Sequence, residues 1–306
     1  MTITPRVLLH YDMDHTEPGM DIVTCPEYDD ERLRELLPDV QVIWHVLRPI
    51  GAEDMDRAPG LRLIQKLGSG VNTIDLDAAA ERGIAVANMP GRNARAVAET
   101  SLLLMLAALR RLVTFDRLTR EGRGWPPGRA MVGGELAGRT VGLLGGGEIA
   151  GLLRETLEAL GARVLFTSRR PRPDDPAWRE LDDLLRASDI VSVHIPLTDE
   201  THHLLDRRRL ALLPPGAIVV NTARGPVIDE AALVEALASG HLGGAGLDVF
   251  EEEPTKADNP LLALDNVVVM PHVAWLTRET WARYFEVAAE NVHRLASGRD
   301  LLYRVR

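Results

Sequence analysis

Three side chains in the second half of the chain have the types and the spacing to carry out proton and anion chemistry. Arg224, Glu253 and His272 each follow a run of apolar residues that predicts a buried strand. An imidazole can donate a proton near neutral pH, and a guanidinium can bind a carboxylate through two parallel hydrogen bonds. A carboxylate beside the histidine would hold its ring and favour its protonated form. Since ligands of open parallel sheets bind at the carboxyl ends of the strands, we expect one shared site.

Other polar residues near these motifs have simpler interpretations. Glu251 and Glu252 are expected to face solvent, and His202 with His203 is expected to form a solvated turn. His194 is expected to be structural or to line a cofactor site. No cluster of His, Cys and carboxylate residues has metal-ligand spacing, so no metal is predicted. There is also no G-x-S-x-G element for an acyl-transfer nucleophile.

A glycine-rich turn in the middle of the chain predicts a bound dinucleotide. Val141–Leu144 is typical of a buried parallel strand, and the leucines after the glycines have helical spacing up to a second predicted strand. Gly145, Gly147 and Ala150 fit the pattern G-x-G-x-x-G/A. The first permits the tight turn, the second lets a pyrophosphate approach the backbone, and the third lets the helix pack on the strand. The helix N-terminus then offers N–H groups to the phosphates.

The end of the second strand indicates which dinucleotide is bound. An acidic residue about 20 residues after the glycines would hold the adenosine ribose hydroxyls. Here the strand Val164–Phe166 is followed by Thr167, Ser168, Arg169 and Arg170, with no carboxylate. A carboxylate would repel a 2′-phosphate, whereas a hydroxyl and two guanidiniums can bind one. We therefore expect NADP(H) in preference to NAD(H).

With a dinucleotide bound, the three side chains fit hydride transfer to a ketone. His272 would donate a proton to the developing alkoxide, and Arg224 would orient a substrate carboxylate. Glu253 is the carboxylate predicted to hold the histidine ring. Asp248, which also follows a predicted strand, could accept hydrogen bonds at the nicotinamide end.

Composition limits the remaining function classes. The chain has 306 residues, of which 45% are hydrophobic and 26% charged, so two globular domains are expected. The net charge of −10 argues against general nucleic-acid binding. Cys25 is the single cysteine, which excludes an intrachain disulfide and fits a cytoplasmic setting. The longest apolar run, Leu102–Leu109, is far shorter than a membrane span, and the N-terminus lacks the apolar core of a signal peptide.

Short strands and helices alternate on both sides of the fingerprint, which predicts two parallel-sheet α/β domains. In the N-terminal part we expect strands at Arg6–His10, Val40–Val46, Leu61–Leu67 and Ile84–Ala87, and helices at Glu31–Leu37 and Leu76–Arg82. A long, largely buried helix is expected at Ala94–Leu112, and a loop or arm at Glu121–Gly134. Further strands are expected at Asp189–Pro196, Gly216–Thr222, Gly243–Val249 and Val267–Met270, and a helix at Asp229–Ser239.

The last helix, Arg278–Ser297, has its apolar residues on one face and is expected to return to the N-terminal domain. The predicted division is a substrate domain of residues 1–95 plus 276–306 and a dinucleotide-binding domain of residues 96–275.

Taken in order, these motifs resemble those of the D-2-hydroxyacid dehydrogenases. Lys66-Leu-Gly-Ser-Gly-Val-Asn-Thr-Ile-Asp75 is similar to the family's substrate loop, and Gly83–Gly91 with Ala96–Glu99 is similar to its entry into the interdomain helix. Thr222-Ala-Arg224, Asp248-Val-Phe followed by Glu253-Pro254, and Pro271-His272 match its cofactor and catalytic motifs. The resemblance extends from Lys66 to His272. It implies two α/β domains with the active site in a cleft between them, and a homodimer built through the cofactor domain.

The resemblance also implies residue roles. Backbone N–H groups of Gly68, Ser69 and Gly70 would receive the substrate carboxylate. Besides the two fingerprint glycines, the residues implied at the cofactor are Glu148, Ile149, Ser168, Arg169, Arg170, Pro196, Thr201, Thr222, Ala223, Arg224, Asp248 and His272. The departures from the family pattern are Ala150, Ser168 and the run Val-Ala-Trp275 after His272. Trp275 either forms a wall of the substrate pocket or packs against the last helix.

The sequence therefore predicts an NADP(H)-preferring 2-ketoacid reductase, and the resemblance favours glyoxylate and hydroxypyruvate as substrates. Enzyme alternatives are an NAD-dependent formate or phosphoglycerate dehydrogenase of the same fold. Formate dehydrogenases are disfavoured because the resemblance implies that they have a glutamine, rather than a glutamate, as the partner of the histidine. A different class is a nucleotide-sensing binding protein without catalysis.

Overall fold

The computed structural model describes residues 5–125 and 132–306. The chain divides into two compact units: unit 1 comprises Met1–Asn93 and Thr277–Arg306, and unit 2 comprises Ala94–Leu276. Each unit is built on a sheet whose paired strands all run parallel. The predicted fold class, two parallel-sheet α/β units, is therefore confirmed.

Unit 1 contains a five-stranded sheet in the order β2-β1-β3-β4-β5. The strands are β1 (Arg6–His10), β2 (Asp21–Cys25), β3 (Val42–His45), β4 (Leu63–Lys66) and β5 (Ala85–Ala87). The helices are α1 (Asp30–Leu36), the short 3-10 turn η1 (Leu37–Asp39), α2 (Ala52–Asp56) and α3 (Leu76–Glu81). The side chains of Asp29 and Asp75 accept hydrogen bonds from the first turns of α1 and α3, and so fix where these helices begin.

Two elements of unit 1 are absent from the sequence prediction. β2 lies at the edge of the sheet and pairs with β1 from Arg6 opposite Asp21 to His10 opposite Cys25. Its side chains are mostly half-buried, so the sequence lacks the continuous apolar run by which a central parallel strand is recognised. α2 is only five residues long, which is too short to show a helical period.

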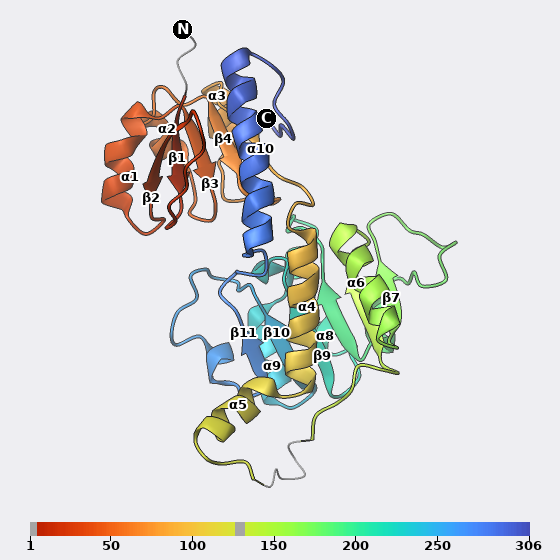
Figure 1. Cartoon of the computed structure of the whole chain (residues 1–306). Helices are drawn as coiled ribbons and strands as arrows, with labels where there is room; N and C mark the ends of the chain where they lie inside the picture. Colours follow the sequence, from red (N-terminus) through yellow and green to blue (C-terminus); the bar gives the residue numbers. More distant parts are fainter. Residues whose placement is uncertain (1–4, 126–131) are drawn as a thin grey trace. The chain divides into compact units, whose positions relative to one another are not determined.

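The last helix, α10 (Arg278–Ser297), belongs to unit 1 and lies alongside its sheet (Figure 1). The ring of Trp281 lies 5.1 Å from that of Tyr11, and the ring of Phe285 stacks on His15 at 3.5 Å. A buried amide pair ties the helix to β4, because Asn291 Nδ2 donates to Gln65 Oε1 at 2.6 Å. The apolar face predicted for this helix therefore packs on the N-terminal part of the chain.

Unit 2 contains a six-stranded sheet in the order β11-β10-β9-β8-β6-β7. The strands are β6 (Thr140–Leu144), β7 (Arg163–Thr167), β8 (Ile190–Val193), β9 (Ala217–Asn221), β10 (Leu242–Leu247) and β11 (Val267–Val269). The helices and 3-10 turns are α4 (Ala94–Leu109), α5 (Leu112–Arg120), α6 (Glu148–Ala159), α7 (Leu181–Ala187), α8 (Arg207–Leu210), η3 (Gly225–Val227), α9 (Glu230–Ala238) and η4 (Pro260–Ala263). In Figure 1, α4 and α6 lie next to each other in front of this sheet.

The long helix predicted at Ala94–Leu112 is wrong at its C-terminal end. α4 stops at Leu109, and Arg111 adopts a left-handed conformation with φ of 51° before α5 begins. α5 has no buried residue, and α4 is buried along only part of its surface, because Arg95, Glu99 and Leu103 are exposed. The expected burial nearly all round is therefore wrong for both helices. The predicted arm Glu121–Gly134 lies partly outside the described residues. No helix in the described parts of the chain combines the length and the apolar character needed to span a bilayer.

Gly246 in β10 lets α4 pack close to the sheet. A Cβ atom built on Gly246 would lie 2.8 Å from Leu104 Cβ and 3.2 Å from the Leu104 carbonyl oxygen. Leu104 is buried within α4. Gly246 therefore reflects the short distance between helix and strand, whereas a Cβ on Gly243 or Gly244 would first meet the Gly216 or Asn266 carbonyl oxygen, at 2.5 and 2.8 Å.

We predict that Gly246→Ala destabilises the protein by about 1–3 kcal/mol, the usual range for overpacking a well-packed core. The matched control is Gly151→Ala in the exposed part of α6, where an added Cβ would meet no atom within 4 Å. Alanine in a helix is favoured over glycine by about 0.5–1 kcal/mol, so this control should be neutral or stabilising. Urea unfolding followed by circular dichroism gives both free energies, and equal stability of the two variants would contradict the packing argument.

Candidate active site

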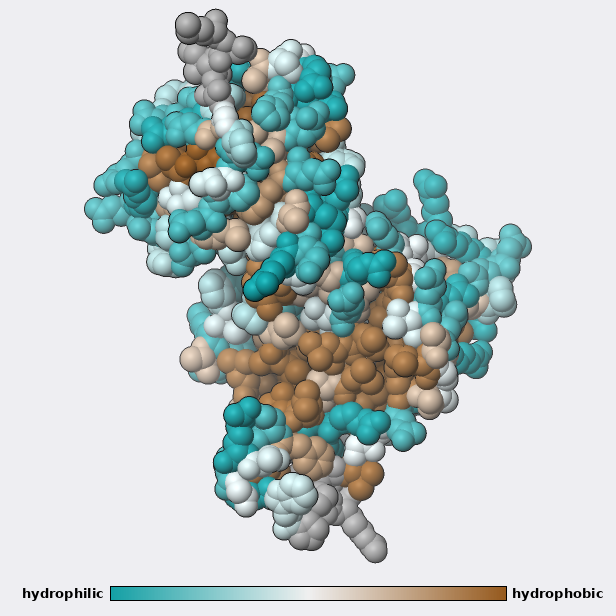
Figure 2. All heavy atoms as spheres, viewed as in Figure 1, coloured by the Kyte–Doolittle hydropathy of each residue, from teal (hydrophilic) through white to brown (hydrophobic). Residues whose placement is uncertain are grey.

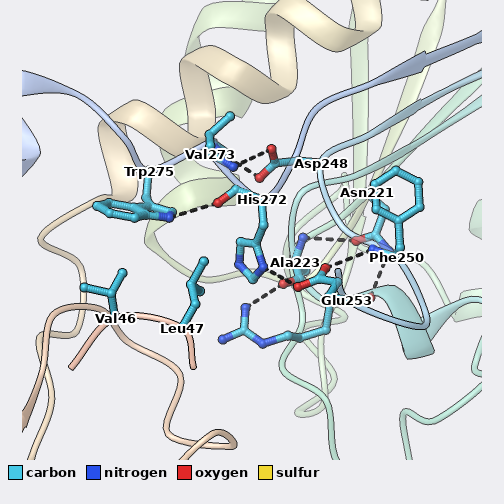
Figure 3. A network of polar contacts seen from close by, with 12 residues as sticks. Val46, Leu47, Asn221, Ala223, Asp248, Phe250, Glu253, His272, Val273 and Trp275 are labelled. Atoms are coloured by element: carbon cyan, nitrogen blue, oxygen red, sulfur yellow. Dashed lines mark hydrogen bonds and ion pairs between the residues drawn. The ribbon is translucent and has the colours of Figure 1, made fainter. Parts of the chain in front are cut away.

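A histidine and a glutamate meet at the carboxyl ends of β10 and β11 in unit 2. His272 Nδ1 lies 2.7 Å from Glu253 Oε2 (Figure 3). The second oxygen of this carboxylate, Oε1, accepts the backbone N–H of Phe250 at 3.0 Å, so the carboxylate is fixed from both sides. Because Nδ1 is the atom engaged by the carboxylate, Nε2 is the nitrogen through which His272 can exchange a proton with another molecule.

The loop that carries His272 is held by Asp248. The two carboxylate oxygens of Asp248 accept the backbone N–H groups of Val273 at 2.8 Å and Ala274 at 2.9 Å, and its carbonyl oxygen accepts the N–H of His272 at 2.7 Å. His272 itself has φ of 57°, a conformation that few residues with side chains adopt. These bonds hold it there and give Asp248 a positioning role that the sequence prediction, a contact at the nicotinamide end, did not include.

Trp275 also positions this loop. Its indole N–H donates to the carbonyl oxygen of His272 at 3.0 Å, and Figure 3 shows the ring lying beside the loop. The hydrogen bond gives the tryptophan a structural role within unit 2. Both roles predicted for Trp275 from the sequence, a wall of a substrate pocket and packing against the last helix, stay predictions.

Arg224 lies on a neighbouring loop, directly after β9. Asn221, the last residue of β9, donates from Nδ2 to the Arg224 carbonyl oxygen at 2.8 Å and accepts the N–H of Ala223 at 3.0 Å. The Arg224 guanidinium donates from Nη1 to the Ala223 carbonyl oxygen at 2.6 Å. A Cβ on Gly225 would lie 1.8 Å from the Phe250 carbonyl oxygen, so only glycine lets this loop rest on the backbone of the loop that carries Glu253.

Burial and charge act together on the ionisable groups of this site. Burial lowers the pKa of Arg224 from its ordinary value, and the nearby Glu253 opposes that shift. Burial works to raise the pKa of Glu253, but the hydrogen bond and charge of His272, the Phe250 N–H and Arg224 outweigh it and lower the pKa below its ordinary value. Glu253 is therefore ionised throughout the neutral range. Burial raises the pKa of Asp248, although its two backbone hydrogen bonds and the charge of His272 oppose the rise.

The glycine-rich turn has the geometry that a pyrophosphate requires. Gly145 has φ of 123°, and a Cβ there would lie 2.4 Å from the carbonyl oxygen of His194, so the tight turn requires glycine. Gly147 is the N-cap of α6, and a Cβ there would meet no atom within 4 Å. The N-terminus of α6 is thus open to an anion, with Glu148 exposed and Ile149 half-buried in its first turn, while Ala150 is buried against the sheet.

The residues after β7 form a cationic turn. Ser168 donates from Oγ to the Arg170 carbonyl oxygen at 2.7 Å, and the side chains of Arg169 and Arg170 are exposed. The guanidinium of Arg172 lies over the Phe166 ring, 5.9 Å from its centroid. The pKa of Glu200 is lowered mainly by the Thr198 hydroxyl and, more weakly, by Arg169, which places this acidic side chain in the field of the turn.

Three other predicted cofactor contacts lie at the ends of β8 and β9. Thr201 donates from Oγ1 to the Pro196 carbonyl oxygen at 2.7 Å, which closes the turn after β8. Thr222 is buried, and its hydroxyl lies 2.8 Å from that of Ser101 in α4. Burial lowers the pKa of His194 to about 4. His194 is therefore neutral at physiological pH and suits a structural role rather than proton donation.

The predicted substrate loop lies in unit 1, directly after β4. The carbonyl oxygen of Gly68 accepts the N–H of Met89 at 2.8 Å, and that of Ser69 accepts Asn88 Nδ2 at 2.8 Å. The Ser69 hydroxyl donates to the Met89 carbonyl oxygen at 3.2 Å. The loop is thus anchored through its carbonyl side. Gly70 completes it at a half-buried position.

The structure adds residues that the sequence prediction missed. Asn221 and Gly225 fix the Arg224 loop, and the Phe250 N–H fixes Glu253. Asn221 stands directly before Thr222-Ala-Arg224. A polar residue at the end of an apolar strand was the sequence signal that could have indicated its role. Glu251, expected to face solvent alone, is bonded to His203 Nε2. Sequence spacing could not reveal that pair because 48 residues separate its members.

Comparison with known proteins agrees with this geometry. The family model described as D-isomer specific 2-hydroxyacid dehydrogenase, NAD binding domain, matches residues 102–274. A glyoxylate reductase of Aeropyrum pernix is 43% identical over 261 residues, which cover 82% of this chain and 78% of that protein. A crystal structure of a protein from Thermus thermophilus has a TM-score of 0.90 and 39% identity, over 98% of this chain and 100% of the other.

A second solved structure carries ligands. It is an NADPH-dependent glyoxylate/hydroxypyruvate reductase of Sinorhizobium meliloti in complex with NADP and malonate, with a TM-score of 0.83 and 32% identity over 99% of this chain and 97% of that one. The family match, the relatives and the fold agree with one another. This chain therefore belongs to the D-isomer-specific 2-hydroxyacid dehydrogenases, a family of NAD(P)-dependent oxidoreductases.

Proposed function

We propose that this protein reduces small 2-ketoacids to 2-hydroxyacids with NADPH, and that glyoxylate and hydroxypyruvate are its preferred substrates. The observation that carries the proposal is the His272–Glu253 pair, with 2.7 Å between Nδ1 and Oε2. A carboxylate on Nδ1 supports an imidazolium that donates its other proton, as ketone reduction requires. The names of the glyoxylate and hydroxypyruvate reductases among its relatives support the substrate class.

Each residue has a defined task in this reaction. The bound nicotinamide cofactor would supply the hydride, and the open turn around Gly147 fits its pyrophosphate. Arg224 would bind the substrate carboxylate and carbonyl oxygen, with Gly68, Ser69 and Gly70 as further carboxylate donors in the proposal. His272 would give its Nε2 proton to the carbonyl oxygen as the alkoxide develops. Glu253 would keep the imidazole protonated and oriented, and Asp248 would keep its loop in place.

Two alternatives within the fold predict different results. A formate dehydrogenase would oxidise formate and would have no need of a proton donor. A nucleotide-sensing protein would bind the dinucleotide without turnover. The carboxylate partner of His272 favours the reductase, and a panel of 2-ketoacids, 3-phosphohydroxypyruvate and formate, assayed by nicotinamide absorbance, distinguishes all of these activities.

We predict that His272→Ala lowers the kcat of ketoacid reduction by about 10²–10⁴-fold, the usual worth of general acid catalysis. The dissociation constant for NADPH should change little, because the glycine turn that would bind the phosphates lies after a different strand. Steady-state kinetics and fluorescence titration with NADPH measure the two quantities. A variant that keeps full turnover would remove His272 from the proposed mechanism.

Glu253→Gln is predicted to move the alkaline limb of the reduction profile to lower pH. The reason is that the glutamine keeps a hydrogen bond but removes the negative charge that favours the imidazolium. Since the pKa of Glu253 is lowered by His272, the Phe250 N–H and Arg224, the wild-type profile should keep this support down to mildly acidic pH. Oxidation of the hydroxyacid needs neutral His272, so it should suffer less than reduction near neutrality.

The matched control for this pair is Glu252→Gln, since Glu252 makes a surface ion pair with Lys256. Its pH profile should coincide with that of the wild type. Equal losses in both reaction directions for Glu253→Gln, with no movement of either profile, would show that the carboxylate does not act through His272.

The proposed preference for NADPH rests on Ser168 and Arg169. Each lost contact to a phosphate is worth about 1.5–3 kcal/mol, which is roughly 10–150-fold in affinity. Ser168→Asp together with Arg169→Ala should therefore weaken NADPH binding strongly and NADH binding little. Arg163→Ala, at the opposite end of β7, is the matched control and should leave the ratio unchanged. A wild-type protein that binds NADH more tightly than NADPH would refute the assignment.

We also propose that the protein is a homodimer built through unit 2. Figure 2 shows a continuous hydrophobic surface where α4 lies in Figure 1. Leu103 on α4 and Leu112 and Val113 on α5 are 51%, 52% and 50% exposed. Apolar patches of this kind on a protein surface mark sites of association. α5 is fixed for such a role, because Arg117 Nη2 donates to Asp265 Oδ1 at 2.9 Å.

Leu103→Asp should convert the proposed dimer into a monomer at micromolar concentration, since it places an unpaired charge in an apolar contact. Light scattering coupled to gel filtration measures the mass. Tyr28→Asp, an equally drastic change at an exposed aromatic residue of unit 1, should leave the mass unchanged. A monomeric wild-type protein would overturn this assignment without touching the catalytic one.

A further inference from the structure

Two histidines and a glutamate outside the proposed catalytic site lie together on the surface of unit 2. His202 and His203 belong to the turn after β8, and Glu251 belongs to the loop after β10. One ligand atom from each of the three residues lies within 4.8 Å of the other two. Among the residues that the structure describes, this is the one group of three His, Cys, Asp or Glu side chains with ligand atoms so close.

The histidine turn is fixed to the rest of unit 2 by its backbone. His203 adopts φ of 48°, and its N–H donates to the Pro226 carbonyl oxygen at 2.8 Å. Two residues later, the Leu205 N–H donates to the Val227 carbonyl oxygen at 3.0 Å. These bonds direct the His203 ring toward the loop after β10, where its Nε2 meets the Glu251 carboxylate.

The carboxylate side of the cluster is anchored as well. The backbone N–H of Glu251 donates to Glu230 Oε2 at 2.9 Å, and Glu230 Oε1 accepts Asn259 Nδ2 at 2.7 Å. The rings of His202 and His203 stack, with their centroids 4.0 Å apart. Two imidazoles and one carboxylate are therefore presented from two anchored segments that are 48 residues apart in sequence.

We propose that His202, His203 and Glu251 form a binding site for a transition-metal dication of the Zn²⁺ class. Imidazole nitrogens suit Zn²⁺, Co²⁺ and Ni²⁺, whereas Mg²⁺ and Ca²⁺ take oxygen ligands. With Zn–N bonds of about 2.0–2.1 Å, two nitrogens on one tetrahedral ion lie roughly 3.3 Å apart. Coordination by both imidazoles therefore requires the exposed His202 ring to turn out of its stack on His203, and water would complete the coordination.

The position of this site gives the ion a structural consequence. Glu251 stands two residues before Glu253 in the same loop, and His202 directly follows Thr201. A bound ion would replace the hydrogen bond between His203 and Glu251 with coordinate bonds. It would thus fasten the loop that carries Glu253 to the turn after β8. The expected effect is a higher melting temperature of the whole chain in the presence of the ion.

The test uses the full-length protein without a polyhistidine tag, treated with chelator and then titrated with Zn²⁺ by calorimetry. Co²⁺ serves as a spectroscopic probe, because its visible absorption reports imidazole ligation. One equivalent should bind, and His202→Ala, His203→Ala and Glu251→Gln should each weaken binding at least about tenfold. His293→Ala, a single exposed histidine on α10, is the matched control and should bind as the wild type does.

Several results would overturn the site. These are the absence of stoichiometric binding, binding that survives all three ligand variants, and binding that is lost in His272→Asn but kept in His203→Ala. The last result would place the ion at the proposed catalytic pair. Far-ultraviolet circular dichroism of each variant shows whether it is folded. If one of the three ligand variants fails to fold, the other two still test the site.

Discussion

The buried carboxylate of Asp248 is the constraint on which the site of unit 2 depends. Its side chain is 1% exposed, so its charge is stabilised by the two backbone N–H groups that it accepts rather than by water. Those N–H groups belong to the two residues after His272, and the Asp248 carbonyl oxygen accepts the N–H of His272 itself. A left-handed histidine backbone is unfavourable in isolation, and this set of bonds makes it the stable arrangement.

The same principle of mutual support joins the loops after β9 and β10. The Asp248 N–H donates to the Asn221 carbonyl oxygen at 2.9 Å, while the Asn221 side chain holds the Arg224 loop. Gly225 lets that loop rest directly on the backbone at Phe250. The positions of Arg224, proposed to bind the substrate, and of His272, the proposed proton donor, are therefore determined by backbone contacts among the ends of three strands.

The hydrophobic pattern of the sequence predicted the strands that are buried along their whole length, and it failed for a strand that is only partly buried. The central strands β6, β8, β9 and β10 are near-continuous apolar runs and were predicted at the right places. The edge strand β2 is half-buried and was missed. The helix predicted at Ala94–Leu112 runs past the end of α4 at Leu109, and α5 was not predicted. Only the left-handed backbone at Arg111 separates them, and an arginine carries no sequence signal for that conformation.

The sequence by itself determined the fold class, the dinucleotide turn and the candidacy of Arg224, Glu253 and His272. These depend on short-range patterns, namely strand period, glycine spacing and polar residues after strands, which are written in contiguous residues. Only the tertiary structure decided what Asp248 holds and that His203 lies against Glu251. Such pairings join residues that are 25 to 48 positions apart. The distance between them is set by how parallel strands order themselves in the sheet, and that order is a property of the packed core rather than of any local segment.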